Sequence, residues 1–146
     1  MITQNKLKRS PKFVTFWTVL AFLLINIFKP YVNLSLYKTV TALMITISIL
    51  GIFIIRLYNN NIKTEDKLRL HIDDILFHWI PLLYILLIVK IPKIKINIVM
   101  FIIPFLFILL HSSLHDYSKL YYYTGWSNNK AIIIGALVYL SVLSII

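Results

Sequence analysis

Five long apolar segments, separated by short basic or polar linkers, constrain the fold of this chain more than any other feature. Each segment is 16 to 20 residues long, and together they cover residues 13–28, 36–55, 71–89, 96–111 and 130–146. An α-helix needs about 20 apolar residues to cross a bilayer, with about 17 as a lower limit. Because the segments are continuous rather than alternating, they favour helices over barrel strands. The sequence predicts an all-α polytopic membrane protein, a bundle of about five transmembrane helices that forms one integral membrane domain over residues 1–146.

The composition excludes an ordinary water-soluble domain. Hydrophobic residues make up 60% of the chain and charged residues 14%, whereas soluble domains are near half apolar and a quarter charged. The chain has no cysteine, which excludes a disulfide framework, a thiolate metal site and a cysteine nucleophile. The first segment follows a basic stretch, as a signal peptide does, but no small-residue cleavage site precedes Lys29-Pro30. We therefore expect a retained span.

The basic residues indicate both a partner and an orientation. The chain has 15 Lys and Arg against 5 Asp and Glu, and most of the positive charge lies between apolar segments. We expect these side chains to face anionic lipid headgroups rather than nucleic acid. With five spans, one side carries the amino terminus and ten basic residues, and the other side carries five. The positive-inside rule then puts the amino terminus in the cytoplasm. The ten are Lys6, Lys8, Arg9, Lys12, Arg56, Lys63, Lys67, Arg69, Lys119 and Lys130; the five are Lys29, Lys38, Lys90, Lys93 and Lys95.

Polar groups are costly inside spans, so those near the span ends point to function. Thr15 opens the first segment, at a depth similar to that of the four histidines, which begin the third segment or end the fourth. His71, Asp74 and His78 have the spacing i, i+3, i+7, which places them on one face of a continued helix. A carboxylate one turn from an imidazole can fix the imidazole tautomer and raise its basicity. Alternatively, His71 and Asp74 are interfacial residues and His78 bonds a backbone carbonyl.

A metal site is a weaker alternative. His111 and His115 have the i, i+4 spacing of metal ligands, and with His71 and His78 they could form a zinc site. However, the pair lies at the membrane boundary, where histidine is common, and the sequence has no His-Glu-x-x-His motif. We therefore expect no metal and no cofactor.

Aromatic residues and prolines border the same region. The aromatic cluster between the fourth and fifth segments fits an interfacial belt, and it fits equally the roof of a groove through which lipid enters. Pro81 and Pro104 are expected to kink their helices, which would open room for a ligand beside His78. The cluster consists of Tyr117, Tyr121, Tyr122, Tyr123 and Trp126.

Two short motifs carry a resemblance to a known family. The sequence Lys12-Phe13-Val14-Thr15-Phe16 is similar to the Lys-Phe-Leu-Thr-Phe that begins a span in the androgen-induced and androgen-dependent membrane hydrolases and their bacterial relatives. The sequence Phe77-His78-Trp79-Ile80-Pro81-Leu82-Leu83 is similar to that family's histidine followed by proline and aliphatic residues. The aliphatic segment with Pro104-Phe105 and the Tyr-rich stretch follow in the same order. The resemblance extends from Lys12 to the end of the chain.

The resemblance implies a threonine hydrolase that cleaves lipid esters of the type in which a fatty acid is esterified to a hydroxy fatty acid. In that case Thr15 would be the nucleophile, His78 the general base, and the substrate a lipid from the bilayer. Asp74, one turn before His78, is our candidate for the orienting residue. The sequence identifies no oxyanion donor. The alternative is a non-catalytic polytopic membrane protein, such as a lipid-binding or assembly subunit, in which Thr15 and His78 would lie far apart.

Overall fold

A computed structural model describes residues 13–146, and these residues form helices and turns without any strand. The predicted all-α architecture is confirmed. The α-helices are α1 (Val14–Ile27), α2 (Leu34–Leu57), α3 (Thr64–Asp74), α4 (Ile80–Leu87), α5 (Val99–Leu114), α6 (Tyr117–Leu120) and α7 (Asn128–Ile145). A π-helix, η4 (Ile75–Trp79), joins α3 to α4, and short 3₁₀ turns form η2 (Lys29–Tyr31), η3 (Asn59–Asn61) and η5 (Tyr122–Thr124).

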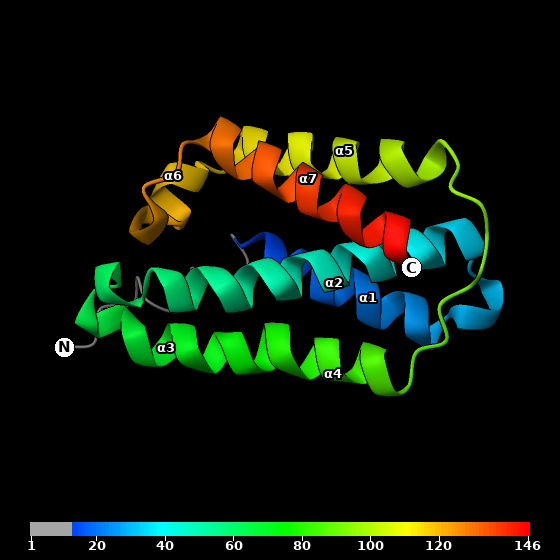
Figure 1. Ribbon diagram of the computed structural model, residues 1–146, viewed down its shortest axis with the longest axis horizontal. Helices are drawn as coiled ribbons and strands as arrows, with labels where there is room; N and C mark the ends of the chain where they lie inside the picture. Colours follow the sequence, from blue (N-terminus) through cyan, green and yellow to red (C-terminus); the bar gives the residue numbers. More distant parts are fainter. Residues whose placement is uncertain (1–12) are drawn as a thin grey trace.

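The long helices run side by side between two ends of a bundle (Figure 1). One end holds the η3 turn, the start of α3 and the α6 region. The other end holds η2 and an extended strap, residues 88–98, that crosses from α4 to α5. Helix α2 is the central element, because it packs against α1, α3, α4, α5 and α7. The site described below lies where α1, α2 and η4 meet.

Three buried threonines of the central helix α2 are satisfied by hydrogen bonds within the helix itself. Thr39, Thr41 and Thr46 are buried, and each hydroxyl donates to the carbonyl four residues earlier at 2.7 to 2.8 Å. These three hydroxyls therefore need no partner from another helix. Small side chains also let neighbouring helices approach closely. Ala42 and Ser48 add two more small buried positions.

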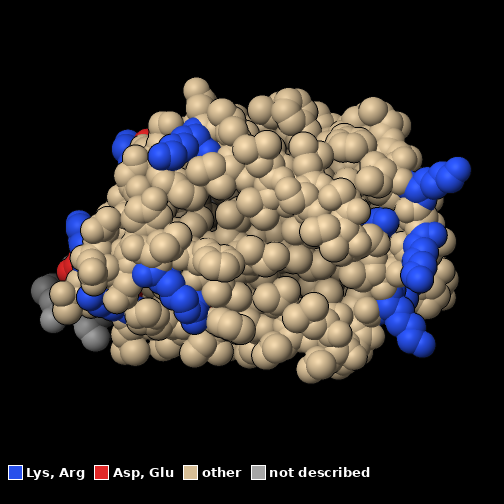
Figure 2. Space-filling model, in the orientation of Figure 1, with Lys and Arg blue, Asp and Glu red and all other residues tan. Residues whose placement is uncertain are grey.

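The helix lengths and the apolar surface of the bundle are typical of a membrane protein. Helices α2 and α7, and the continuous segment Thr64–Leu87, are long and apolar enough to cross a bilayer, while α1 and α5 are shorter apolar helices. Large hydrophobic side chains are exposed along the helices. Figure 2 shows a wide face without charged residues, with Lys and Arg gathered toward the two ends. Monomeric soluble proteins rarely expose so large an apolar surface.

The helix boundaries differ from the predicted segments mainly at the start of the third segment and next to the strap. The third helical segment begins at Thr64, seven residues before the predicted start at residue 71, with Glu65 and Asp66 in its first turn, where negative charge is favourable. Helix α5 begins at Val99 rather than at residue 96. The strap stays extended around Pro92, which has no N–H to donate to a helix.

A buried lysine fixes this strap to α2. Lys38 is 4% exposed and donates to the Ile94 carbonyl at 3.1 Å, while Asn97 donates to the Ser35 hydroxyl at 2.7 Å. We predict that Lys38→Met lowers the free energy of unfolding by about 1.5 to 3 kcal/mol, because it removes a hydrogen bond from a charged donor and leaves a carbonyl unpaired.

Thermal unfolding in detergent measures this effect, and Lys93→Met is the matched control because Lys93 lies exposed on the same strap. Equal changes in melting temperature for the two variants would contradict the anchoring role of Lys38.

Candidate active site

His78 lies in an irregular turn of its helix. Residues Ile75–Trp79 form a π-helix, and the Ile80 N–H donates to the Ile75 carbonyl five residues earlier. Pro81 follows directly, without an N–H and with a ring that would clash with the carbonyl four residues before it in a regular helix. The wider turn therefore lies where proline makes a regular helix unfavourable. Single π-turns inside α-helices are frequent at functional sites.

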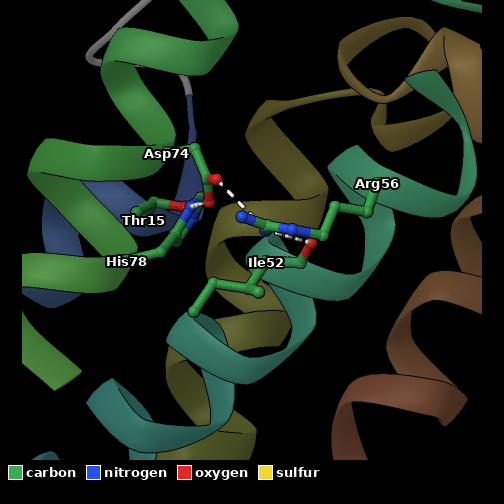
Figure 3. A network of polar contacts seen from close by, with 5 residues as sticks. All are labelled: Thr15, Ile52, Arg56, Asp74 and His78. Atoms are coloured by element: carbon green, nitrogen blue, oxygen red, sulfur yellow. Dashed lines mark hydrogen bonds and ion pairs between the residues drawn. The ribbon is translucent and has the colours of Figure 1, made fainter.

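The structure brings Thr15, His78 and Asp74 together, as Figure 3 shows. The distance from Thr15 Oγ1 to His78 Nε2 is 3.4 Å, and the distance from His78 Nδ1 to Asp74 Oδ1 is 3.0 Å. An ionised carboxylate only accepts hydrogen bonds, so Nδ1 carries the hydrogen and Nε2 presents a lone pair to the Thr15 hydroxyl. Thr15 does not act as a helix cap, because α1 begins without a side-chain cap. These contacts have the geometry of an activated hydroxyl.

Arg56 extends this group by one residue, and sequence analysis had treated it only as a flanking charge. Its Nη1 lies 3.4 Å from Asp74 Oδ2 and donates to the Ile52 carbonyl at 3.0 Å. The guanidinium also lies 5.1 Å from the centre of the Trp79 ring. Asp74 therefore uses one oxygen for the histidine and the other for the arginine, which fixes the carboxylate plane.

Gly51 of α2 provides the space for the imidazole, and sequence analysis missed it. A Cβ atom at position 51 would lie 2.2 Å from His78 Nε2 and 2.3 Å from Cε1. Any side chain at this position would therefore displace the ring. The available signal was a glycine within an apolar helix, which costs helix stability and usually has a packing or functional reason.

An apolar cavity of about 140 Å³ borders Thr15 and His78. Its walls come from α1, α2, α3, η4, α5, the α6–η5 region and α7. Ile47, Leu50, Phe77 and Ile108 are among the apolar residues in these walls. The cavity can therefore hold a hydrocarbon group beside the threonine hydroxyl.

The aromatic cluster covers this cavity. Tyr117, Tyr121, Tyr123 and Trp126 all line it, which agrees with the groove roof, one of the two interpretations of this cluster from the sequence. Burial raises the pKa of both Tyr117 and Tyr123 above the usual value, so both hydroxyls stay protonated at neutral pH. Tyr122 instead donates to Asp66 at 2.9 Å and lines a second, more polar cavity of about 330 Å³.

The remaining histidines lie outside this group. His71 is exposed whereas Asp74 and His78 are buried, so the expected shared face of all three is wrong for His71. His111 Nδ1 lies 2.9 Å from the Tyr117 hydroxyl, and the rings of His111 and His115 are 4.7 Å apart. Within residues 13–146, no three histidine or carboxylate side chains cluster as metal ligands would.

Comparisons with protein-family models, with curated proteins and with solved structures found no match to this chain. The chemistry that the site can perform is therefore inferred from its geometry alone. The Thr15 hydroxyl, the His78 imidazole and the Asp74 carboxylate form a chain of contacts next to an apolar cavity. This is the arrangement of a nucleophile, its base and the group that orients the base.

The contact between Gly51 and His78 can be tested directly. We predict that Gly51→Ala displaces the imidazole and lowers the free energy of unfolding by roughly 1 to 3 kcal/mol, as overpacking does. The ¹⁵N chemical shifts of the His78 ring and thermal unfolding report the two effects.

Gly135→Ala is the matched control, because a Cβ atom there meets nothing within 4 Å and alanine is favoured over glycine in a helix. Unchanged His78 shifts in the Gly51 variant would show that the ring does not depend on this space.

Proposed function

We propose that this protein is an intramembrane hydrolase of lipid acyl esters, with Thr15 as nucleophile, His78 as general base and Asp74 as orienting residue. The observation that supports it most is the 3.4 Å distance between Thr15 Oγ1 and His78 Nε2, which joins residues 63 positions apart. Catalytic hydrogen bonds are often this long before substrate binds. The resemblance of the two sequence motifs to the membrane threonine hydrolases agrees with this assignment.

The proposed reaction has two steps. In the first, Thr15 Oγ1 bonds to the ester carbonyl carbon while its proton passes to His78 Nε2; the alcohol then leaves with that proton as its C–O bond breaks. In the second, water attacks the acyl-threonine, gives a proton to His78, and releases the acid as the proton returns to Thr15. Asp74 stabilises the imidazolium in both steps.

The membrane supplies the proposed substrate. We propose five spans, α1, α2, Thr64–Leu87, α5 and α7, with the amino terminus in the cytoplasm. The shorter α1 and α5 would cross with the help of flanking residues or local thinning of the bilayer. The described basic residues occupy both ends of the bundle (Figure 2), while Lys6, Lys8, Arg9 and Lys12 lie outside the described residues. An acyl chain would enter the apolar cavity laterally, without passing through water.

The non-catalytic alternative made the opposite geometric prediction. In a lipid-binding or assembly subunit, Thr15 and His78 would be expected to lie far apart, yet the two are neighbours. Burial of both Asp74 and His78 is also costly for a purely structural role. We therefore propose catalysis ahead of passive binding.

We predict that Thr15→Ala and His78→Ala each lower the kcat of ester hydrolysis by at least about 10³-fold, because each removes a member of one catalytic unit. Hydrolysis of a 4-nitrophenyl fatty acyl ester by purified protein in detergent measures this loss. A fluorophosphonate probe should label the parent protein and fail to label the Thr15 variant.

Thr18→Val is the matched control, because the Thr18 hydroxyl lies one turn further along α1 and donates to the Val14 carbonyl. It should keep both hydrolysis and labelling. Turnover by Thr15→Ala at the parent rate would refute the catalytic assignment.

The orienting role of Asp74 makes a separate prediction. Asp74→Asn keeps the shape of the side chain but can donate to His78 and so favour the wrong tautomer; we expect kcat to fall roughly 10²- to 10⁴-fold with little change in KM. Asp116→Asn, which keeps a capping residue at the start of α6, should change neither constant. Equal kinetics for the two variants would exclude Asp74 from the mechanism.

A further inference from the structure

We infer that the Tyr121 hydroxyl is the oxyanion donor of the site. This inference depends on the proposed hydrolase function and adds the group that the sequence could not supply: a hydrogen-bond donor for the negative charge that develops on the ester carbonyl oxygen. Such donors are usually the largest single contribution to acyl transfer.

Tyr121 reaches the site from a distant part of the chain. It lies between α6 and η5 and lines the same apolar cavity as Thr15 and His78. Its ring packs edge-on against Phe13, with 5.6 Å between ring centres, and against Tyr117 at 6.0 Å. These contacts hold the ring over the start of α1, where the proposed nucleophile lies.

The hydroxyl of Tyr121 has a partner that leaves its hydrogen available. The backbone N–H of Val14 lies within hydrogen-bonding reach of the hydroxyl oxygen. This N–H belongs to the first turn of α1, where no carbonyl of the helix can accept it. A phenol that accepts a hydrogen bond can still donate its own hydrogen, so the Tyr121 O–H can point into the cavity. Val14 precedes Thr15 directly, so donor and nucleophile lie at the same turn.

Two further features suit this role. Burial raises the pKa of the Tyr121 hydroxyl well above its usual value, so the group stays protonated and neutral as a donor must. Two neighbouring tyrosines have other hydroxyl partners: the Tyr117 hydroxyl lies 2.9 Å from His111 Nδ1, and the Tyr122 hydroxyl donates to Asp66.

In the proposed step, Thr15 Oγ1 forms a bond to the carbonyl carbon and the π-electron pair moves to the carbonyl oxygen. That oxygen accepts a hydrogen bond from Tyr121, while the proton of Thr15 goes to His78. When the carbonyl re-forms, the C–O bond to the alcohol breaks and the alcohol takes the proton from His78. Tyr121 keeps its own proton throughout.

The test compares Tyr121→Phe with Tyr122→Phe in the full chain in detergent, with 4-nitrophenyl octanoate as substrate. Both variants lose one hydroxyl from the same segment, but Tyr122 lies outside the cavity that holds Thr15. We expect kcat to fall 10²- to 10³-fold in Tyr121→Phe with KM within threefold, and Tyr122→Phe to stay within threefold in both constants. Fluorophosphonate labelling should slow in parallel with kcat.

A second variant separates a donor from a structural contact. Tyr121→4-methoxyphenylalanine keeps the oxygen beside Val14 but has no hydrogen to donate, so it should be as slow as Tyr121→Phe while melting like the parent protein. It also replaces Tyr121→Phe if that variant fails to fold. A kcat near the parent value in either variant, with Thr15→Ala inactive, would overturn the inference alone. Parent-level turnover by Thr15→Ala would overturn the proposed function and the inference together.

Discussion

The position of the His78 ring depends on Gly51 of the facing helix α2. Because Gly51 has no Cβ, the imidazole lies directly against the backbone of α2, at a distance no other residue would allow. With one face held there, Asp74 fixes one ring nitrogen and the other nitrogen points to Thr15. Helices α1, α2 and the α3–α4 segment therefore converge on one side chain. The packing of these helices therefore determines the geometry of the site.

This constraint explains why an irregular helix is tolerated in a segment that is long and apolar enough to cross a membrane. A π-turn and a proline each weaken the regular hydrogen bonding that a spanning helix requires, and here they occur together around His78. Side-chain contacts compensate, because the buried Asp74 bonds both His78 of the π-turn and Arg56 of α2. An isolated helix of this sequence would lack the contacts with Arg56 and Gly51 of α2, so tertiary contacts contribute to the local backbone geometry.

The sequence predicted those parts of the structure that depend on local spacing. Apolar segment lengths gave the helical architecture, and the four-residue interval between Asp74 and His78 gave their contact, which the structure shows at 3.0 Å. The meeting of Thr15 with His78 followed from the family resemblance rather than from spacing. A glycine within an apolar helix marked Gly51 as unusual, but no local pattern encodes that His78 becomes its neighbour. The role proposed for Tyr121 depends in the same way on residues distant in sequence. The strap was read as a short linker for the same reason: Lys38, its anchor, lies 56 residues from Ile94.

The two cavities differ in polarity, and the proposed hydrolysis needs both an apolar substrate and water. The apolar cavity beside Thr15 suits an acyl chain, but the second step of the proposed reaction requires water. The polar cavity lined by Asp66, Arg69 and Lys119 shares Phe13, Leu70 and Tyr123 with the apolar one. These three shared side chains therefore lie between the apolar cavity and the more polar one. Lipid ester groups lie where hydrocarbon meets headgroups, so the proposed hydrolase would need its nucleophile near such a boundary, and Thr15, in the first turn of α1, borders the apolar cavity next to these shared side chains.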